Sequence, residues 1–162
     1  ADHIRSISVL GRAGIIEGGK YDLILPVNYF KEQYPGSFIS FGKNHLTKES
    51  FEELGFDSSN IHSGDMLTVP GTAIQNKEVL KFYNEKYKIV GLEMEGAHYV
   101  SGMIHSQKSE LLSEDIMKNF GYWASDKPID PSQTLGEEHM TKGINSSIIL
   151  AIATLNNILS WR

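Results

Sequence analysis

The sequence lacks cysteine altogether, since none of its 162 residues is a Cys. Disulfides, thiolate metal sites and cysteine nucleophiles are therefore excluded. It also lacks a long apolar run: the longest, Ile148–Leu155, is interrupted by Thr154 and is far shorter than the ~20 residues that cross a bilayer. No basic segment followed by an apolar segment opens the chain, as a secretory signal would require. We expect a cytoplasmic protein with no membrane partner.

Positive charge is also scarce. The chain has 15 Lys and Arg against 20 Asp and Glu, a formal net charge of −5 at pH 7, and its cations are scattered. Binding to a phosphate backbone needs clustered Lys and Arg, so no nucleic acid partner is expected. The six histidines show no metal-ligand spacing, and neither a P-loop nor a Gly-x-Ser-x-Gly motif occurs. We therefore expect no metal site and no cofactor.

What remains is the composition of an ordinary globular protein. Hydrophobic residues make up 40% and charged residues 22% of the chain, unlike the composition of a disordered chain. The length corresponds to about one domain of ~150 residues. No repeat or Pro/Gly-rich linker divides the sequence. We predict a single domain over residues 1–162.

Short apolar strands alternate with helical patterns along this domain. Local patterns predict strands over 7–10, 22–27, 89–92 and 121–124, and helices over 48–54, from 76, from 95 and over 144–159. The last helix carries one apolar stripe, formed by Ile144, Ile148, Ala151, Leu155 and Leu159. The alternation is typical of an α/β fold with a mixed, mostly parallel sheet. Ligands of such folds bind beyond the carboxyl ends of the strands.

Three segments at predicted strand ends carry polar groups. The first, Gly11–Gly14, follows a strand that ends at Leu10 and is expected to be a tight loop. Glycines let backbone N–H groups approach an anion, and Arg12 adds a fork-shaped donor for phosphate or carboxylate. The same residues also fit a simple chain turn with a solvated Arg12.

The second segment places Glu93, Met94 and Glu95 where a buried strand becomes a helix. Alternation in the extended part sends both carboxylates to one side and Met94 to the other. Glu95 suits a ribose diol, which can donate two hydrogen bonds to a carboxylate, and a thioether offers apolar surface to a sugar or base. Equally, both acids suit a helix N-terminus, where the macrodipole favours negative charge.

The third segment ends an apolar run in Ser125 and Asp126, just before Pro128. Apolar neighbours such as Tyr122 and Trp123 would raise the pKa of a short acid at this point, and the acid could then donate a proton. The alternative is an ordinary Asx turn before proline.

Together these segments resemble the nucleoside phosphorylase and nucleosidase superfamily. That superfamily includes purine nucleoside phosphorylases, uridine phosphorylases and methylthioadenosine/S-adenosylhomocysteine nucleosidases. The segment His62–Leu67 also resembles its Ser-Gly-Asp-x-Phe segment. The motifs follow one another in the family's order, from about Ile7 to the last helix.

The resemblance implies a role for each matching residue. Met94, Glu95 and Glu93, the preceding acid of the same motif, would bind the ribose. Asp126 would be the general acid that protonates the leaving base. The remaining implied contacts are Ser125, Met66 and Leu67 in the base pocket, and Gly11 and Arg12 at the phosphate or anion site. Two positions depart from the family pattern, since Arg12 replaces Ser or Thr and Leu67 replaces a stacking Phe.

The resemblance also implies an α/β fold of three layers, with a central sheet flanked by helices. The chain would correspond to the C-terminal two-thirds of that fold and lack its first strands. The implied activity is cleavage of the N-glycosidic bond of a purine-type nucleoside, by phosphorolysis or hydrolysis. Inorganic phosphate would be the co-substrate of phosphorolysis, and a homo-oligomer is expected.

Two other functions stay open. The chain could bind a nucleoside or nucleotide without turning it over, given Arg12, Leu67 and the absence of the family's first strands. It could also be an interaction fragment that another chain completes, because a sheet without its first strands exposes an apolar edge.

Overall fold

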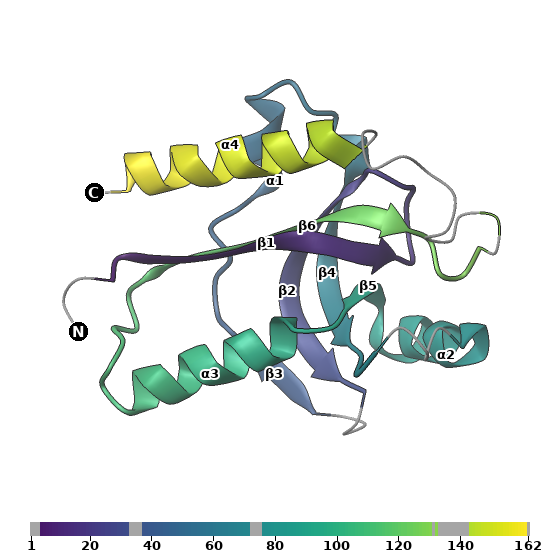
Figure 1. Cartoon of the computed structure of the whole chain (residues 1–162), viewed down its shortest axis with the longest axis horizontal. Coiled ribbons are helices and arrows are strands. Elements are labelled where there is room, and N and C mark those ends of the chain that lie inside the picture. The colour runs from purple at the N-terminus through teal and green to yellow at the C-terminus, as the bar shows by residue number, and fades with distance from the viewer. Residues whose placement is uncertain (1–3, 33–36, 72–75, 131, 133–142, 162) are drawn as a thin grey trace.

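The computed structural model describes residues 4–32, 37–71, 76–130, 132 and 143–161. The strands are β1 (Ser6–Ile15), β2 (Leu23–Lys31), β3 (Phe38–Ser40), β4 (Ile61–Thr68), β5 (Ile89–Glu93) and β6 (Met117–Asp126). The helices are α1 (Lys48–Glu52), the short 3-10 helix η1 (Ser58–Asn60), α2 (Lys77–Tyr87), α3 (Gly96–Lys108) and α4 (Ile144–Ser160). Figure 1 shows α4 and α3 on opposite sides of the long β1 and β6 strands. None of the helices in these ranges is long and apolar enough to cross a bilayer.

The strands form one mixed sheet in the order β3-β2-β4-β5-β1-β6. Three pairings are parallel, namely β1 with β6, β2 with β4, and β4 with β5. β2 also pairs with β6, so that five strands close into a ring and β3 extends it from β2. The mixed α/β fold is therefore as predicted, but the strands close into a ring, whereas the resemblance implied a three-layer fold with a central sheet flanked by helices. Strand twist favours such closure.

Residues Gly11–Gly14 form part of β1, and the prediction of a glycine loop was wrong. The strand runs beside β6 as far as Gly14, with a register shift after Ala13, and Gly14 and Ile15 also pair with β5. Gly11 is needed for packing, because an added Cβ would lie 3.3 Å from the Tyr122 ring on β6. Gly14 is similarly crowded, with its added Cβ 2.8 Å from Pro128. These glycines admit neighbouring side chains and do not turn the chain.

The predicted helix starts are confirmed. Thr47 precedes α1, and Gly55, with φ of 79°, follows it. Asn76 caps α2 by accepting a hydrogen bond from the backbone N–H of Glu78. These signals are local, so the sequence alone carries them.

Helix α4 lies where it was predicted, but its apolar stripe faces outward. The buried residues of α4 are Ser146, Leu150, Ala153 and Thr154. The two polar ones are satisfied locally, since Ser146 donates to the carbonyl of Tyr21 at 2.6 Å and Thr154 to that of Leu150 at 2.8 Å. Small side chains let the helix approach the sheet closely, and Leu150 packs over Gly121 of β6.

Truncation of Leu150 tests this packing of α4 on the sheet. We expect Leu150→Ala to lower the free energy of unfolding by about 2–5 kcal/mol, because it leaves a cavity beneath the helix. Asn156→Ala, on the exposed side of the same helix, should change it by no more than about 0.5 kcal/mol. Urea denaturation measures both values. Equal effects of the two substitutions would contradict the observed orientation of α4.

Candidate functional site

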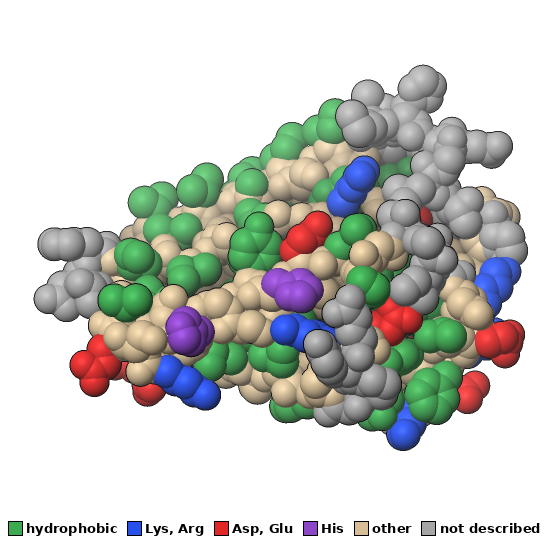
Figure 2. Space-filling view, turned by 60° about the horizontal axis from the view of Figure 1, so that its bottom comes forward, with side chains coloured by type: hydrophobic (Ala, Val, Ile, Leu, Met, Phe, Trp, Pro, Cys, Tyr) green, Lys and Arg blue, Asp and Glu red, His purple; other side chains and the backbone are tan. Residues whose placement is uncertain are grey.

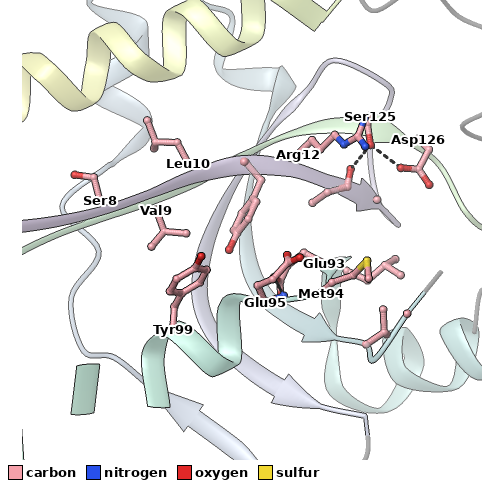
Figure 3. Close-up of a pocket in the computed structure, with 17 residues that line it drawn as sticks. Ser8, Val9, Leu10, Arg12, Glu93, Met94, Glu95, Tyr99, Ser125 and Asp126 are labelled. Atoms are coloured by element: carbon pink, nitrogen blue, oxygen red, sulfur yellow. Dashed lines mark hydrogen bonds between the residues drawn. The ribbon is translucent and has the colours of Figure 1, made fainter. Parts of the chain in front are cut away.

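A cavity of about 630 Å³ opens between β1 and the turn that joins β5 to α3. Its lining comes from four segments, namely 8–14, 69–71, 92–99 and 122–126. Figure 3 shows Ser125 and Asp126 above the cavity and Glu93, Met94 and Glu95 across from them. Of the predicted site residues, the cavity brings together Gly11, Arg12, Glu93, Met94, Glu95, Ser125 and Asp126.

Glu93 is the last residue of β5, and its carboxylate is buried with 6% exposure. One oxygen accepts a hydrogen bond from the hydroxyl of Thr68. The other accepts from the backbone N–H groups of Glu95, at 2.7 Å, and Gly96. The Thr68 hydroxyl in turn accepts from the N–H of Ala97 at 3.0 Å. Glu93 therefore ties the end of β4 to the first turn of α3.

Burial raises the pKa of Glu93 above its ordinary value. The hydrogen bonds from Thr68, Gly96 and Glu95 oppose this shift, and the nearby charge of Glu95 adds to it. The oxygen of Glu93 that faces α3 therefore already accepts two hydrogen bonds from the backbone. The geometry of Glu93 is that of a group that positions the β5–α3 turn.

Glu95, in contrast to the buried Glu93, is exposed, and its carboxylate lines the cavity. It occupies the N-cap position of α3, but its side chain makes no capping hydrogen bond, and the residue is exposed. Met94 is 40% exposed beside it and also lines the cavity. An acceptor-only group next to a thioether can bind a diol and the apolar face of the sugar that carries it.

Asp126 is the last residue of β6 and is 3% exposed. The hydroxyl of Ser125 lies 2.7 Å from its Oδ1 and 3.3 Å from the carbonyl oxygen of Ala13 (Figure 3). A hydroxyl has one hydrogen, so Ser125 donates well to only one of these acceptors at a time. The shorter contact orients the Asp126 carboxyl group, which the pair presents to the cavity.

Tyr122 forms part of the inner wall of the site and contacts the buried Tyr29 behind it. Tyr122 lines the cavity, and its hydroxyl lies 3.0 Å from that of Tyr29. Burial, together with the charge of Glu93, raises the pKa of Tyr122. An added Cβ on Gly96 would lie 2.8 Å from the Tyr122 hydroxyl, so a larger residue could not begin α3 here. Trp123 points away, because its ring packs under Gly143 at the start of α4.

Two predicted residues lie elsewhere. Met66 and Leu67 on β4 have 0% exposure and belong to two different core clusters. The structure does not bring either of them to the cavity, so the base pocket implied by the resemblance is not formed by these side chains. Consecutive residues of a strand point to opposite faces, and in this ring both faces of β4 are covered.

Arg12 supplies positive charge to a cavity that otherwise carries carboxylates. It is exposed on β1, and in Figure 3 its side chain runs towards the carboxyl end of that strand. The ion pairs found among the described residues do not involve it. Its guanidinium is therefore available to an anion.

Sequence reasoning missed Thr68 and Tyr29, which set the geometry of the site. A signal for Thr68 existed, because it ends β4 with a polar residue as Glu93 ends β5 and Asp126 ends β6. Tyr29 carried no such signal, since it lies inside an apolar strand. Within the described part of the chain, no group of three or more His, Asp or Glu is arranged to hold a metal ion.

The solved structures that this chain resembles include nucleosidases and a futalosine hydrolase. A methylthioadenosine/S-adenosylhomocysteine nucleosidase of Campylobacter jejuni aligns with a TM-score of 0.69 and 19% identity, over 95% of this chain and 69% of its own. A futalosine hydrolase of Helicobacter pylori has a TM-score of 0.65 and 16% identity, over 96% and 68%. An AMP nucleosidase of Bacteroides thetaiotaomicron has a TM-score of 0.59 and 16% identity, over 94% and 65%.

These identities establish a shared fold, and this chain spans about two thirds of each of those proteins. The neighbours belong to the nucleoside phosphorylase and nucleosidase superfamily, which is the resemblance indicated by the sequence motifs. No curated protein matches the sequence. A family model does match, over residues 1–160, and the chain belongs to that family, described as a family of unknown function (DUF6909).

Proposed function

We propose that this chain cleaves the N-glycosidic bond of a purine nucleoside or nucleotide by hydrolysis. The observation that carries the proposal is the meeting of Glu95, from the β5–α3 turn, and Asp126, from the end of β6, in one cavity. The nucleosidase and hydrolase functions of structural neighbours support glycosidic cleavage. They also favour water over phosphate as the nucleophile.

Glu95 acts on the sugar. Its exposed carboxylate accepts hydrogen bonds from the 2′- and 3′-hydroxyls, and Met94 covers the apolar side of the ring. As the bond from C1′ to the base nitrogen lengthens, the sugar gains oxocarbenium character. The negative charge of Glu95 stabilises this cation more strongly than the neutral substrate, which is the requirement for lowering the barrier.

Asp126 acts on the base. The electron pair of the breaking bond passes to the purine, and a proton from Asp126 to N7 neutralises the charge that develops there. Water then adds to C1′ and releases a proton to solvent, from which Asp126 is protonated again, so the products are the free purine and ribose or ribose phosphate. Ser125 orients the Asp126 carboxyl group through the 2.7 Å hydrogen bond between them.

Arg12 determines which substrates bind. An unpaired guanidinium in a cavity with two or more carboxylates attracts an anionic group and keeps it away from Glu95 and Asp126. A substrate that carries a phosphate or carboxylate on the sugar meets this requirement better than a neutral nucleoside.

Replacement of Asp126 tests the role of the general acid. Asp126→Asn keeps the shape and a hydrogen bond to Ser125 but has no proton of suitable acidity, so kcat for release of free purine should fall about 10² to 10⁴-fold. This corresponds to roughly 3 to 5 kcal/mol of barrier. Asp115→Asn, a matched change at an exposed position, should leave the rate unchanged.

The assay should use adenosine, inosine, methylthioadenosine, uridine and AMP, each with and without phosphate. An undiminished rate in Asp126→Asn would refute the assigned role. If no substrate releases its base but purine nucleosides still raise the melting temperature, the chain binds them without turnover, and the proposal is overturned.

Substitution of Glu93 should affect mainly the stability of the protein, and substitution of Glu95 mainly its activity. Glu93→Gln removes one acceptor from a buried cluster of donors and should lower the free energy of unfolding by about 1–3 kcal/mol. The pKa of Glu93 is raised in the folded protein, so ionisation of Glu93 lowers the stability of the wild-type protein. The difference in free energy of unfolding between the wild type and Glu93→Gln should therefore shrink as pH rises through that pKa.

Glu95→Gln should change the free energy of unfolding by no more than about 0.5 kcal/mol, since the residue is exposed. It should lower kcat/KM about 10- to 100-fold, the effect of weakening a charged hydrogen bond to the diol. Urea denaturation and the base-release assay, run on both variants, measure the two effects. A stable Glu93→Gln protein together with an unstable Glu95→Gln protein would contradict the geometry.

Arg12→Met should discriminate between substrates. Loss of a charged hydrogen bond raises KM for AMP by about 10- to 100-fold and leaves KM for adenosine unchanged. A parallel loss for both substrates would show that Arg12 does not select an anionic group.

A further inference from the structure

The outward face of α4 is apolar along its whole length. Five large aliphatic side chains, which we call the outer stripe, are exposed by 48%, 49%, 40%, 56% and 81% at Ile144, Ile148, Ile152, Leu155 and Leu159 respectively. Figure 2 shows hydrophobic side chains in a row along the upper edge of the molecule, where α4 lies. Their exposed surface is on the order of 500 Å², as large as the largest apolar patch of a typical monomer.

The absence of charge from α4 is unusual for a helix on the surface. None of the residues from Ile144 to Ser160 is charged. The inner face packs on the sheet through Leu150 and Ala153, and the outer stripe lies on the opposite side. A surface helix normally carries charged or polar residues opposite its core-facing stripe, and large aliphatic side chains in that place indicate a covered surface. A surface helix of a chain with 22% charged residues would carry Lys or Glu on this face.

When Ala151 is added to the outer stripe, the spacing of the six residues is the same read in either direction. Ile144 and Leu159 lie equally far from the midpoint between residues 151 and 152, and so do Ile148 and Leu155. At the midpoint, the small side chain of Ala151 adjoins the larger Ile152. In an antiparallel pair of such helices the large residues at the two ends of the stripe face each other. At the centre Ala151 of each helix faces Ile152 of the other, which suits close packing.

We propose that two copies of this chain associate through antiparallel α4 helices related by a two-fold axis near residues 151 and 152. Ile144 then packs against the partner's Leu159, and Ile148 against the partner's Leu155. No charge is brought together across the axis, because the helix has none. The stripe supplies the apolar centre of an interface, and the polar residues beside it supply the rim that extends each side towards the ~800 Å² of a standard interface.

The first test is the mass of the protein in solution. Sedimentation equilibrium of the 18.1 kDa chain should give twice this mass at micromolar concentration. Ile152→Lys places two cations at the axis and should give the monomer mass, with an unchanged far-ultraviolet spectrum. Leu111→Lys, a matched change at a side chain that is 68% exposed outside α4, should leave the dimer intact. A monomeric wild-type protein, or an Ile152→Lys protein that remains dimeric, would overturn the proposal.

The second test is the orientation of the helices. The sequence has no cysteine, so an introduced one is the only thiol. A thiol crosslinker with a reach of about 10 Å, close to the distance between packed helices, should join two Ile152→Cys chains. It should also join Ile144→Cys to Leu159→Cys, but not two Ile144→Cys chains, which an antiparallel pair holds roughly 22 Å apart. Efficient joining of two Ile144→Cys chains would indicate parallel helices and contradict the pairing.

Discussion

The buried carboxylate of Glu93 is the constraint on which the cavity depends. Its hydrogen bonds join the end of β4, through Thr68, to the first turn of α3, through Glu95 and Gly96. A buried carboxylate is costly unless every lone pair has a donor, so the arrangement holds only when strand, turn and helix are all in place. The position of Glu95 at the mouth of the cavity follows from this arrangement.

Two glutamates separated by one residue thus have different surroundings, one buried and hydrogen-bonded and the other exposed. The sequence placed both on one side of the strand and indicated contact with a ribose for each. What separates them is Thr68, which lies 25 residues before Glu93 and reaches it only because β4 and β5 are parallel neighbours. The local sequence cannot show that Glu93 is hydrogen-bonded to a residue of another strand. The folded structure shows this through the burial of Glu93 and its contact with Thr68.

The same distinction explains which predictions succeeded. Helix starts depend on residues such as Asn76 that act within one turn, so the sequence predicted them correctly. The role of Gly11 depends on Tyr122 from a distant strand, and the residue admits a ring where a loop was expected. Leu67 was assigned to a base pocket by its motif, but closure of the ring buries it. Segment order therefore predicted the α/β fold, the motifs predicted the nucleosidase resemblance, and long-range packing decided the rest.

The central claim is that the cavity breaks a glycosidic bond with water as the nucleophile. Its most direct test is incubation of the protein with AMP and with adenosine in ¹⁸O-labelled water without phosphate, followed by mass spectrometry of the products. The account predicts free adenine and a sugar that carries one ¹⁸O atom at C1′. Recovery of intact substrates after prolonged incubation would contradict it.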